Sequence, residues 1–81
     1  MNVSVKLFAR ARDLVGREAV EIELDDPATI DDLRRRLAAE YPPLASLVAQ
    51  ATFAIDAEYA TGATQIPAEA EIACIPPVSG G

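Results

Sequence analysis

The feature that most constrains the fold of this chain is a change of hydrophobic period within residues 1–40. Residues 3–9 and 18–24 alternate apolar and polar side chains, and residues 29–40 repeat their apolar side chains at helical spacing. A period of two is typical of a strand with one buried face, and a period near 3.6 is typical of an amphipathic helix. The pattern therefore predicts two strands followed by a helix.

The two strands have well-defined inner faces, formed by Val3, Val5 and Leu7 in the first and by Val20, Ile22 and Leu24 in the second. Residues 10–15 read as a connection and Gly16 as a turn, so we predict a hairpin with a long loop. Phe8 falls on the polar face of the first strand. A large apolar side chain in that position is a candidate contact for a partner.

The helix has clear start and stop signals. Thr29 is a favourable N-cap, and Asp32, three residues later, completes a capping box. The apolar residues of the helix share one face: Ile30, Leu33, Leu37 and Ala38. Residues 34–36 are three arginines that we predict to be solvated surface, and Pro42-Pro43 end the helix.

The second half of the chain predicts short elements. A second short helix is expected within residues 44–51, and short strands at 52–55 and 58–60 surround a turn. Glu71 to Ile75 is apolar enough for a central strand buried on both faces, and the helix lets this strand lie parallel to the first. We therefore predict an α+β, ubiquitin-like β-grasp fold with a mixed sheet on one main helix. Residues 1–75 form the domain and residues 76–81 an extended, flexible C-terminal tail.

The residue inventory excludes several kinds of catalytic site. The 81 residues contain no histidine and one cysteine, Cys74. Zinc sites of the Cys/His type, Ser-His-Asp and Cys-His catalysis, an internal disulfide and an iron–sulfur cluster held by several thiolates are therefore ruled out. We expect no metal site, because the acid pairs at 25–26 and 31–32 fit a turn and a helix N-terminus. Cys74 is interpreted as a buried hydrophobe and not as a sulfur-relay thiol.

Charge and hydropathy limit the partners. The net charge is −6, and all seven basic residues lie at or before Arg36. Nucleic acid would be repelled, and a basic protein would be attracted, although the charge serves solubility equally well. Because the sequence has neither a signal peptide nor a long apolar run, we expect a cytoplasmic protein that binds no membrane and no nucleic acid.

The candidate functional element is the C-terminal hexapeptide Pro76-Pro77-Val78-Ser79-Gly80-Gly81. Its prolines favour a stiff, extended base, and six extended residues reach roughly 20 Å. Gly80 and Gly81 have no side chains, so together with Ser79, Val78 and Pro77 they form a tail that can thread a partner's active site. The alternative is an incidental frayed end.

The Gly81 carboxylate is the predicted reactive group. It is ionised near neutral pH and is a poor electrophile, so acyl chemistry requires prior activation. Attack on the α-phosphate of ATP gives an acyl-adenylate, and a sulfur donor converts the adenylate to a thiocarboxylate. A thiocarboxylate is a nucleophile that can transfer its sulfur to a small molecule. We therefore predict a carrier protein and not a free-standing enzyme.

Two segments resemble a known family. The terminal hexapeptide is similar to the end of the small subunit of molybdopterin synthase, and Leu7-Phe8-Ala9 with residues 12–16 is similar to that family's opening motif. The resemblance implies a β-grasp fold without a bound cofactor. It also implies that an E1-like adenylating enzyme activates Gly81 with ATP, and that a sulfur donor forms the thiocarboxylate.

The same resemblance implies the destination of the sulfur. The tail would enter the large, catalytic subunit of a heterotetramer, where the thiocarboxylate donates sulfur to cyclic pyranopterin monophosphate in molybdenum cofactor biosynthesis. The small subunit would then be a non-catalytic, sulfur-donating component of this sulfurtransferase. Phe8 and Ile75, apolar residues near the base of the tail, are the candidate contacts with the partner.

The chain departs from the family pattern in three segments: Ile55-Asp56, residues 68–71 and Cys74-Ile75. Relatives usually have an asparagine in the first, Asp-Gly-Asp-Glu in the second and an aromatic residue in the third. Three other functions therefore stay open. The chain could carry sulfur for thiamine or another pathway, could be a ubiquitin-like modifier that forms isopeptide bonds, or could be an interaction domain with an incidental tail.

Overall fold

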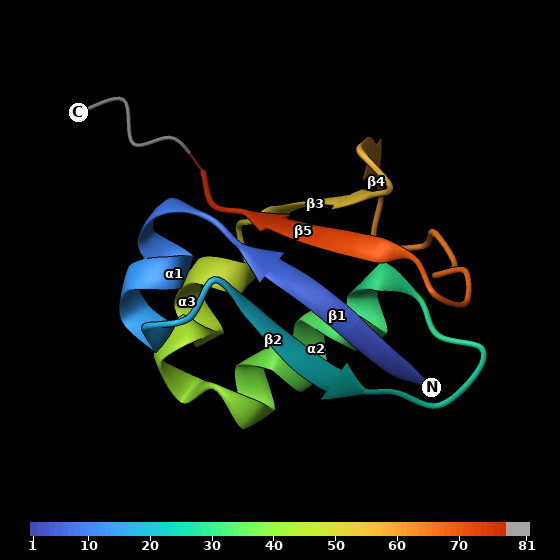
Figure 1. Ribbon diagram of the computed structural model, residues 1–81, viewed down its shortest axis with the longest axis horizontal. Helices are drawn as coiled ribbons and strands as arrows, with labels where there is room; N and C mark the ends of the chain where they lie inside the picture. Colours follow the sequence, from blue (N-terminus) through green and yellow to red (C-terminus); the bar gives the residue numbers. More distant parts are fainter. Residues whose placement is uncertain (78–81) are drawn as a thin grey trace.

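The computed structural model describes residues 1–77, which form a five-stranded mixed sheet (Figure 1). The strands are β1 (Asn2–Leu7), β2 (Ala19–Glu23), β3 (Thr52–Ile55), β4 (Glu58–Ala60) and β5 (Glu71–Ile75). Their order across the sheet is β2-β1-β5-β3-β4, with β5 parallel to β1 and antiparallel to β3. The predicted β-grasp fold and its central parallel strand are confirmed.

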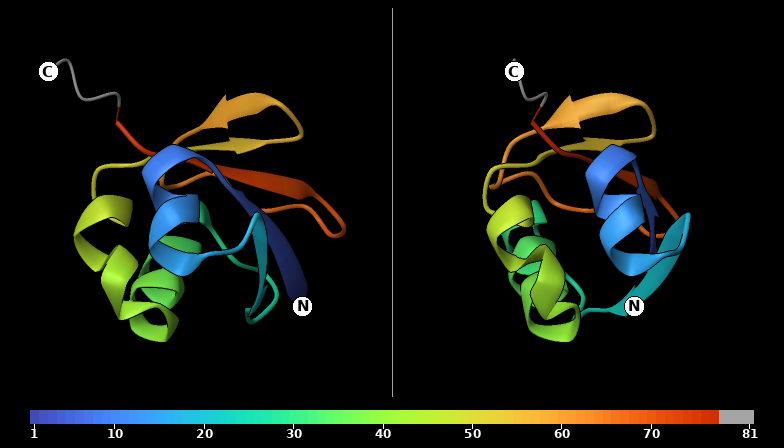
Figure 2. Two further views of the ribbon diagram at one scale, coloured as in Figure 1. Left: turned by 60° about the vertical axis from the view of Figure 1, so that its left-hand side comes forward. Right: turned by 90° about the vertical axis from the view of Figure 1, so that its left-hand side faces the viewer.

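The helices pack together on one face of the sheet and leave the other face open (Figure 2). They are α1 (Ala9–Val15), α2 (Ile30–Glu40), the short 3₁₀ helix η1 (Pro42–Leu44) and α3 (Ala45–Val48). The core lies between the two layers and contains the predicted inner faces of β1 and β2, the α2 residues Ile30, Leu33 and Leu37, and Phe53 from β3. The two prolines follow the end of α2, as predicted.

Helix α2 begins with the predicted capping box. The Thr29 hydroxyl accepts a hydrogen bond from the Asp32 N–H at 3.3 Å, and the Asp32 carboxylate accepts one from the Thr29 N–H at 2.9 Å. The connection between β4 and β5 supplies further acceptors, because the Ile30 and Asp31 N–H groups donate to the carbonyls of Thr64 and Gly62. These contacts satisfy the donors that a helix N-terminus leaves free and fix the loop that leads into β5.

The prediction of a plain connection after β1 was wrong, because residues 9–15 form α1. Only Ala11 of this helix is buried, so its sequence shows little of the helical period. Its N-cap position is Phe8, whose side chain cannot accept a capping hydrogen bond, and so the usual start signal is absent. Gly16 ends the helix with a φ of 77°, and its N–H donates to the Arg12 carbonyl.

Strand β5 is central, but its predicted burial on both faces was wrong. Ile72 and Cys74 point into the core, and Ala73 and Ile75 on the other face are only half-buried. The reason is the position of the helices, which cover one face of the sheet only (Figure 2). The open face of β5 is therefore available for contact with another molecule.

Arg34 differs from its two neighbours, which are exposed as predicted. Its guanidinium donates to the backbone carbonyls of Ala51, at 3.0 Å, and Val48, and it lies 5.0 Å from the centre of the Phe53 ring. The interpretation of Arg34 as solvated surface was therefore wrong. Its side chain instead ties α2 to the end of α3 and to β3.

The helices of residues 1–77 are all short. The longest, α2, has 11 residues, and none combines the length and apolar character needed to cross a membrane.

Candidate functional site

The candidate site begins at the end of β5, where the chain leaves the sheet. Cys74 is paired with Leu7 of β1 on one side and with Phe53 of β3 on the other, so hydrogen-bonded neighbours flank the strand near its end. Pro76 is still buried, and Pro77 is exposed. The exit point is therefore fixed by the sheet and not by a loop. The predicted tail residues Val78, Ser79, Gly80 and Gly81 lie outside the described residues.

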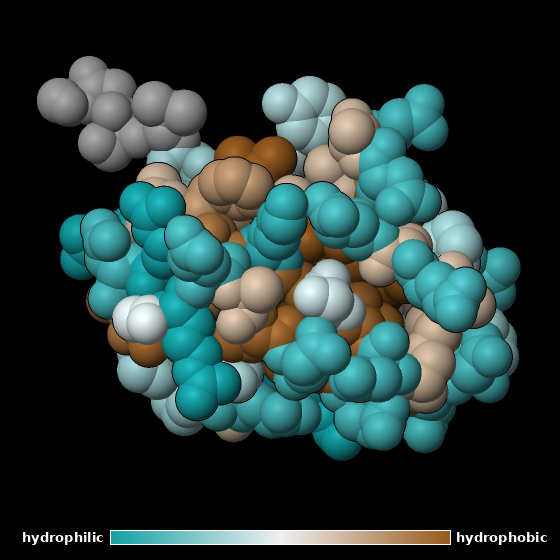
Figure 3. Space-filling model, viewed as in Figure 1, coloured by the Kyte–Doolittle hydropathy of each residue, from teal (hydrophilic) through white to brown (hydrophobic). Residues whose placement is uncertain are grey.

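A shallow hollow of about 490 Å³ lies on the open face of the sheet close to this exit. Its floor is made of small side chains, because Ala73 of β5 pairs with Ala54 of β3. Longer side chains stand around the floor: Lys6, Phe8, Tyr59, Glu71 and Ile75. We call this set of residues the exit hollow. On the face shown in Figure 3, apolar colour gathers beside the base of the tail.

The two predicted partner contacts lie together in the exit hollow. Phe8 is 44% exposed at the end of β1, and Ile75 is half-buried at the end of β5. The structure thus places both side chains next to the exit point. Whether they touch a partner stays a prediction.

Sequence reasoning missed Tyr59, which is 79% exposed on β4 and also lines the exit hollow. It is paired with Ala54, and an exposed tyrosine beside an alanine floor presents an apolar ring to solvent. The available signal was the sequence of the β3–β4 hairpin, because Tyr59 is the only aromatic residue of that short strand.

One ion pair borders the exit hollow. Lys6 Nζ lies 3.3 Å from a carboxylate oxygen of Glu71 on the neighbouring strand, and both side chains are exposed. Lys6 is also the only lysine of the chain. The hollow therefore combines an apolar floor with one cation and one anion that can rearrange at little cost in free energy.

Cys74 faces the core and not the exit hollow. It is fully buried, and this burial raises the pKa of its thiol to about 11. The thiol is thus held in its unreactive protonated form at neutral pH. The interpretation of Cys74 as a buried hydrophobe is confirmed. Among residues 1–77, no cluster of three or more histidine, cysteine, aspartate or glutamate side chains is arranged to hold a metal ion.

Comparison with known proteins identifies the family. Residues 5–81 match the profile of the ThiS family. The chain belongs to the ThiS family. Two relatives, each named "Molybdopterin synthase sulfur carrier subunit", align with 100% of this chain. The one from Caenorhabditis briggsae is 35% identical over 83 residues and covered to 99%, and the one from Chlamydomonas reinhardtii is 34% identical and covered to 100%.

A solved structure shows the same fold. The crystal structure of SAMP1 from Haloferax volcanii superimposes with a TM-score of 0.87 at 29% identity, and all of both chains is covered. The predicted resemblance to the small subunits of molybdopterin synthase is therefore confirmed for the family and the fold. This ThiS-family chain has the β-grasp fold that the resemblance implied.

Proposed function

We propose that this ThiS-family chain is a sulfur carrier whose reactive group is the carboxylate of Gly81. The observation that carries the proposal is the exit of β5, where a strand held between two neighbours is followed by the buried Pro76 and the exposed Pro77. Such an anchor holds the start of the tail in a defined place, so a partner that docks on the body receives the tail in a fixed direction. The names of the two relatives support the same role.

The chemistry proceeds in two steps on the carboxylate. An oxygen of Gly81 attacks the α-phosphorus of ATP, which forms the acyl-adenylate and releases pyrophosphate. Hydrosulfide, supplied by a sulfur donor, then attacks the acyl carbon, the bond from that carbon to the AMP oxygen breaks, AMP leaves, and a thiocarboxylate results. An E1-like enzyme supplies the ATP site, so the carrier needs no cofactor. Cys74, the only thiol of the carrier, is buried and protonated and so cannot relay the sulfur. The contribution of the carrier is therefore to present its terminus.

The proposed acceptor is cyclic pyranopterin monophosphate in the large subunit of molybdopterin synthase. In that heterotetramer, residues 77–81 thread the active site of the large subunit, and the body docks through the exit hollow. Phe8, Ile75 and Tyr59 offer the apolar contact area, and Lys6 and Glu71 the polar border. This chain is then a non-catalytic, sulfur-donating subunit.

A single-turnover experiment tests the acceptor. The thiocarboxylated chain is mixed with the large subunit and cyclic pyranopterin monophosphate, and both the pterin and the carrier are followed by mass spectrometry. The proposal predicts that sulfur appears on the pterin as the carrier returns to its carboxylate form. If the thiocarboxylate stays unchanged in the presence of an active large subunit, the acceptor is not this pterin, and a thiamine-type or other sulfur pathway is indicated.

A second candidate function is protein modification. It is favoured by the match to SAMP1, a protein whose name designates a small archaeal modifier. The acyl-adenylate would then be attacked by a lysine amine of a target, which forms an isopeptide bond and releases AMP. Stable adducts of higher mass, absent from a chain that ends at Gly80, distinguish this function from sulfur transfer.

A further inference from the structure

Strand β2 leaves one edge of the sheet free. Within residues 1–77 it pairs only with β1. The Leu7 N–H donates to the Glu18 carbonyl and the Leu24 N–H to the Met1 carbonyl, so the even-numbered residues of this segment bond toward β1. Because hydrogen bonding alternates along an antiparallel strand, the N–H and C=O groups of Ala19, Glu21 and Glu23 point away from the sheet.

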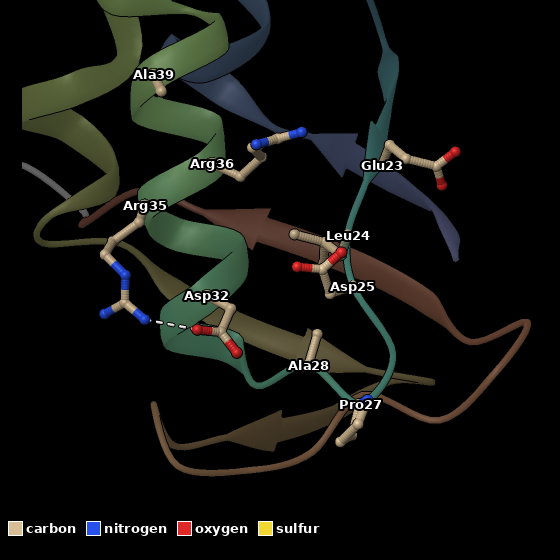
Figure 4. A pocket seen from close by; sticks show the side chains of 9 residues that line it. All are labelled: Glu23, Leu24, Asp25, Pro27, Ala28, Asp32, Arg35, Arg36 and Ala39. Carbon is tan, nitrogen blue, oxygen red and sulfur yellow. Dashed lines mark hydrogen bonds and ion pairs between the residues drawn. The ribbon is translucent and has the colours of Figure 1, made fainter.

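A groove lies at the end of this edge, between Glu23, the loop that follows β2, and helix α2. Its apolar part is formed by Leu24, Pro27, Ala28 and Ala39. Figure 4 shows Leu24 and Asp25, on the loop that follows β2, directed toward α2, and Arg36 directed from the helix toward β2. The free backbone groups can pair with an added strand, which supplies affinity, and the groove at the end of β2 can receive one of its side chains.

The charges beside the groove indicate the kind of strand. On the helix side, Arg35 is paired with Asp32 and Arg36 with Glu40. On the strand side, Glu23 and Asp25 line the groove, and Glu21 and Asp26 lie on the same segment outside it. The Glu21 carboxylate accepts a hydrogen bond from the Asn2 side chain at 3.0 Å. Of these four acidic residues, only Glu23 has an ion-pair partner in the described part of the chain, the Met1 amino group at 3.5 Å. The surplus charge along the free edge is therefore negative.

We propose that the β2 edge binds an extended basic segment of another protein as a sixth strand. A second copy of this chain does not fit, because antiparallel pairing of two β2 strands would place glutamates against glutamates. The edge shares no residue with the exit hollow, so both surfaces can be occupied at once. The proposal is independent of sulfur transfer.

Amide NMR of the full chain tests this proposal with a defined probe. The probe is a capped peptide that alternates lysine and valine over the length of β2, added to millimolar concentration. We expect slowed hydrogen exchange at the Glu21 and Glu23 amides, which face outward, and little change at Val20 and Ile22, which already bond to β1. A peptide of the same composition with its lysines and valines in separate blocks, and one that alternates glutamate and valine, should have no such effect.

Two variants separate the backbone from the charge. Glu21→Pro removes an outward N–H, which an edge strand tolerates, and should abolish the protection with the rest of the amide spectrum unchanged. Glu21→Gln keeps the N–H and should weaken binding about two- to fivefold, the size expected for one exposed charge pair. If Glu21→Pro fails to fold, Glu21→Gln still tests the charge.

Several results would overturn the proposal. One is the absence of protection at Glu21 and Glu23 in the presence of the alternating peptide. Others are equal protection by the block peptide or by the alternating glutamate peptide, and binding that Glu21→Gln leaves unchanged. In each case the glutamates of β2 would instead serve to prevent the edge from pairing with other chains.

Discussion

At the scale of single residues, two side chains near the end of β5 have opposite roles because they lie on opposite faces. Cys74 points into the core and cannot reach solvent, and Ile75 points to the open face beside Phe8. The only thiol of the chain is therefore kept from solvent, and the apolar Phe8 and Ile75 side chains line the exit hollow. This division follows directly from the period of two along a strand.

The first prediction concerns the partner contact. Phe8→Ser should lower the affinity for the large subunit about tenfold, because an aromatic side chain at the edge of the exit hollow has the character of an interface hot spot. The free energy of unfolding should change by less than about 1 kcal/mol, since the ring is already 44% exposed. Calorimetric titration and urea denaturation measure the two quantities.

Leu14→Ser is the matched control for Phe8→Ser. Leu14 is 39% exposed on α1 but does not line the exit hollow. Its replacement should leave the affinity unchanged. Equal losses of affinity in both variants would mean that the exit hollow has no special part in docking.

The second prediction concerns pH and Cys74. Burial raises the pKa of this thiol from 9.0 to about 11, so the folded protein retains its proton above the pH at which the unfolded chain loses it. The free energy of unfolding should therefore fall by about 1–3 kcal/mol as pH rises from 9 to 11. Below pH 9 the contribution of the protonated Cys74 thiol to stability is fully retained. Urea denaturation at pH 8, 9, 10 and 11 measures this slope.

Cys74→Ala isolates the contribution of the thiol, because tyrosine and lysine titrate in the same range. The difference in unfolding free energy between the parent and this variant should shrink as pH rises. A difference that stays constant from pH 8 to 11 would show that Cys74 does not titrate differently in the folded and unfolded states.

At the scale of elements, Arg34 links helix α2 to the end of α3 and to β3. Its guanidinium satisfies two backbone carbonyls at the end of α3 and covers the ring of Phe53. A run of three arginines in a sequence does not reveal which one turns inward, because that depends on where α3 ends. The sequence therefore predicted α2 and its cap but not this contact.

The third prediction concerns this contact. Arg34→Met should lower the free energy of unfolding by about 1–3 kcal/mol, because it keeps a long apolar side chain but leaves the Val48 and Ala51 carbonyls without their donor. Arg36→Met, whose exposed ion pair with Glu40 contributes little, should cost less than about 1 kcal/mol. Urea denaturation of both variants decides the point, and equal effects would refute the role of Arg34.

Also at this scale, the strands could be predicted from sequence and helix α1 could not. The period of two located β1 and β2 to within two residues at each end, because each has one face in the core. A turn signal located β3 and β4, and an apolar run located β5. Helix α1 buries only Ala11 and starts at Phe8 without a polar cap, so neither period nor cap indicated it. The exit hollow likewise depends on strand order, which brings Tyr59 of β4 and Ile75 of β5 together with Phe8, the residue after β1.

At the scale of the whole molecule, residues 1–77 form one packed body, and the proposed reactive group, Gly81, lies outside it in the sequence. The core residues of the described part of the chain lie between Val3 and Cys74, and the last strand is held between two neighbours. The body and the terminus can therefore be separated experimentally. This arrangement agrees with a carrier, whose fold serves recognition and whose terminus holds the cargo.

The fourth prediction follows from this separation. A chain that ends at Pro77 keeps every hydrogen bond and core contact of the described fold, so its free energy of unfolding should match that of the full chain within about 0.5 kcal/mol. It should still dock on the large subunit through the exit hollow and should compete with the full chain. It should not be adenylated. Competition binding and pyrophosphate release measure these properties, and an adenylated truncated chain would contradict the proposal.

The most direct test of the central claim is the intact mass of the full chain after incubation with ATP, sulfide and an E1-like enzyme shown to act on another carrier. The account predicts a gain equal to the replacement of one oxygen by sulfur, located at Gly81 by fragmentation and unaffected by Cys74→Ala. An unchanged mass, or sulfur found on Cys74 instead, would contradict it.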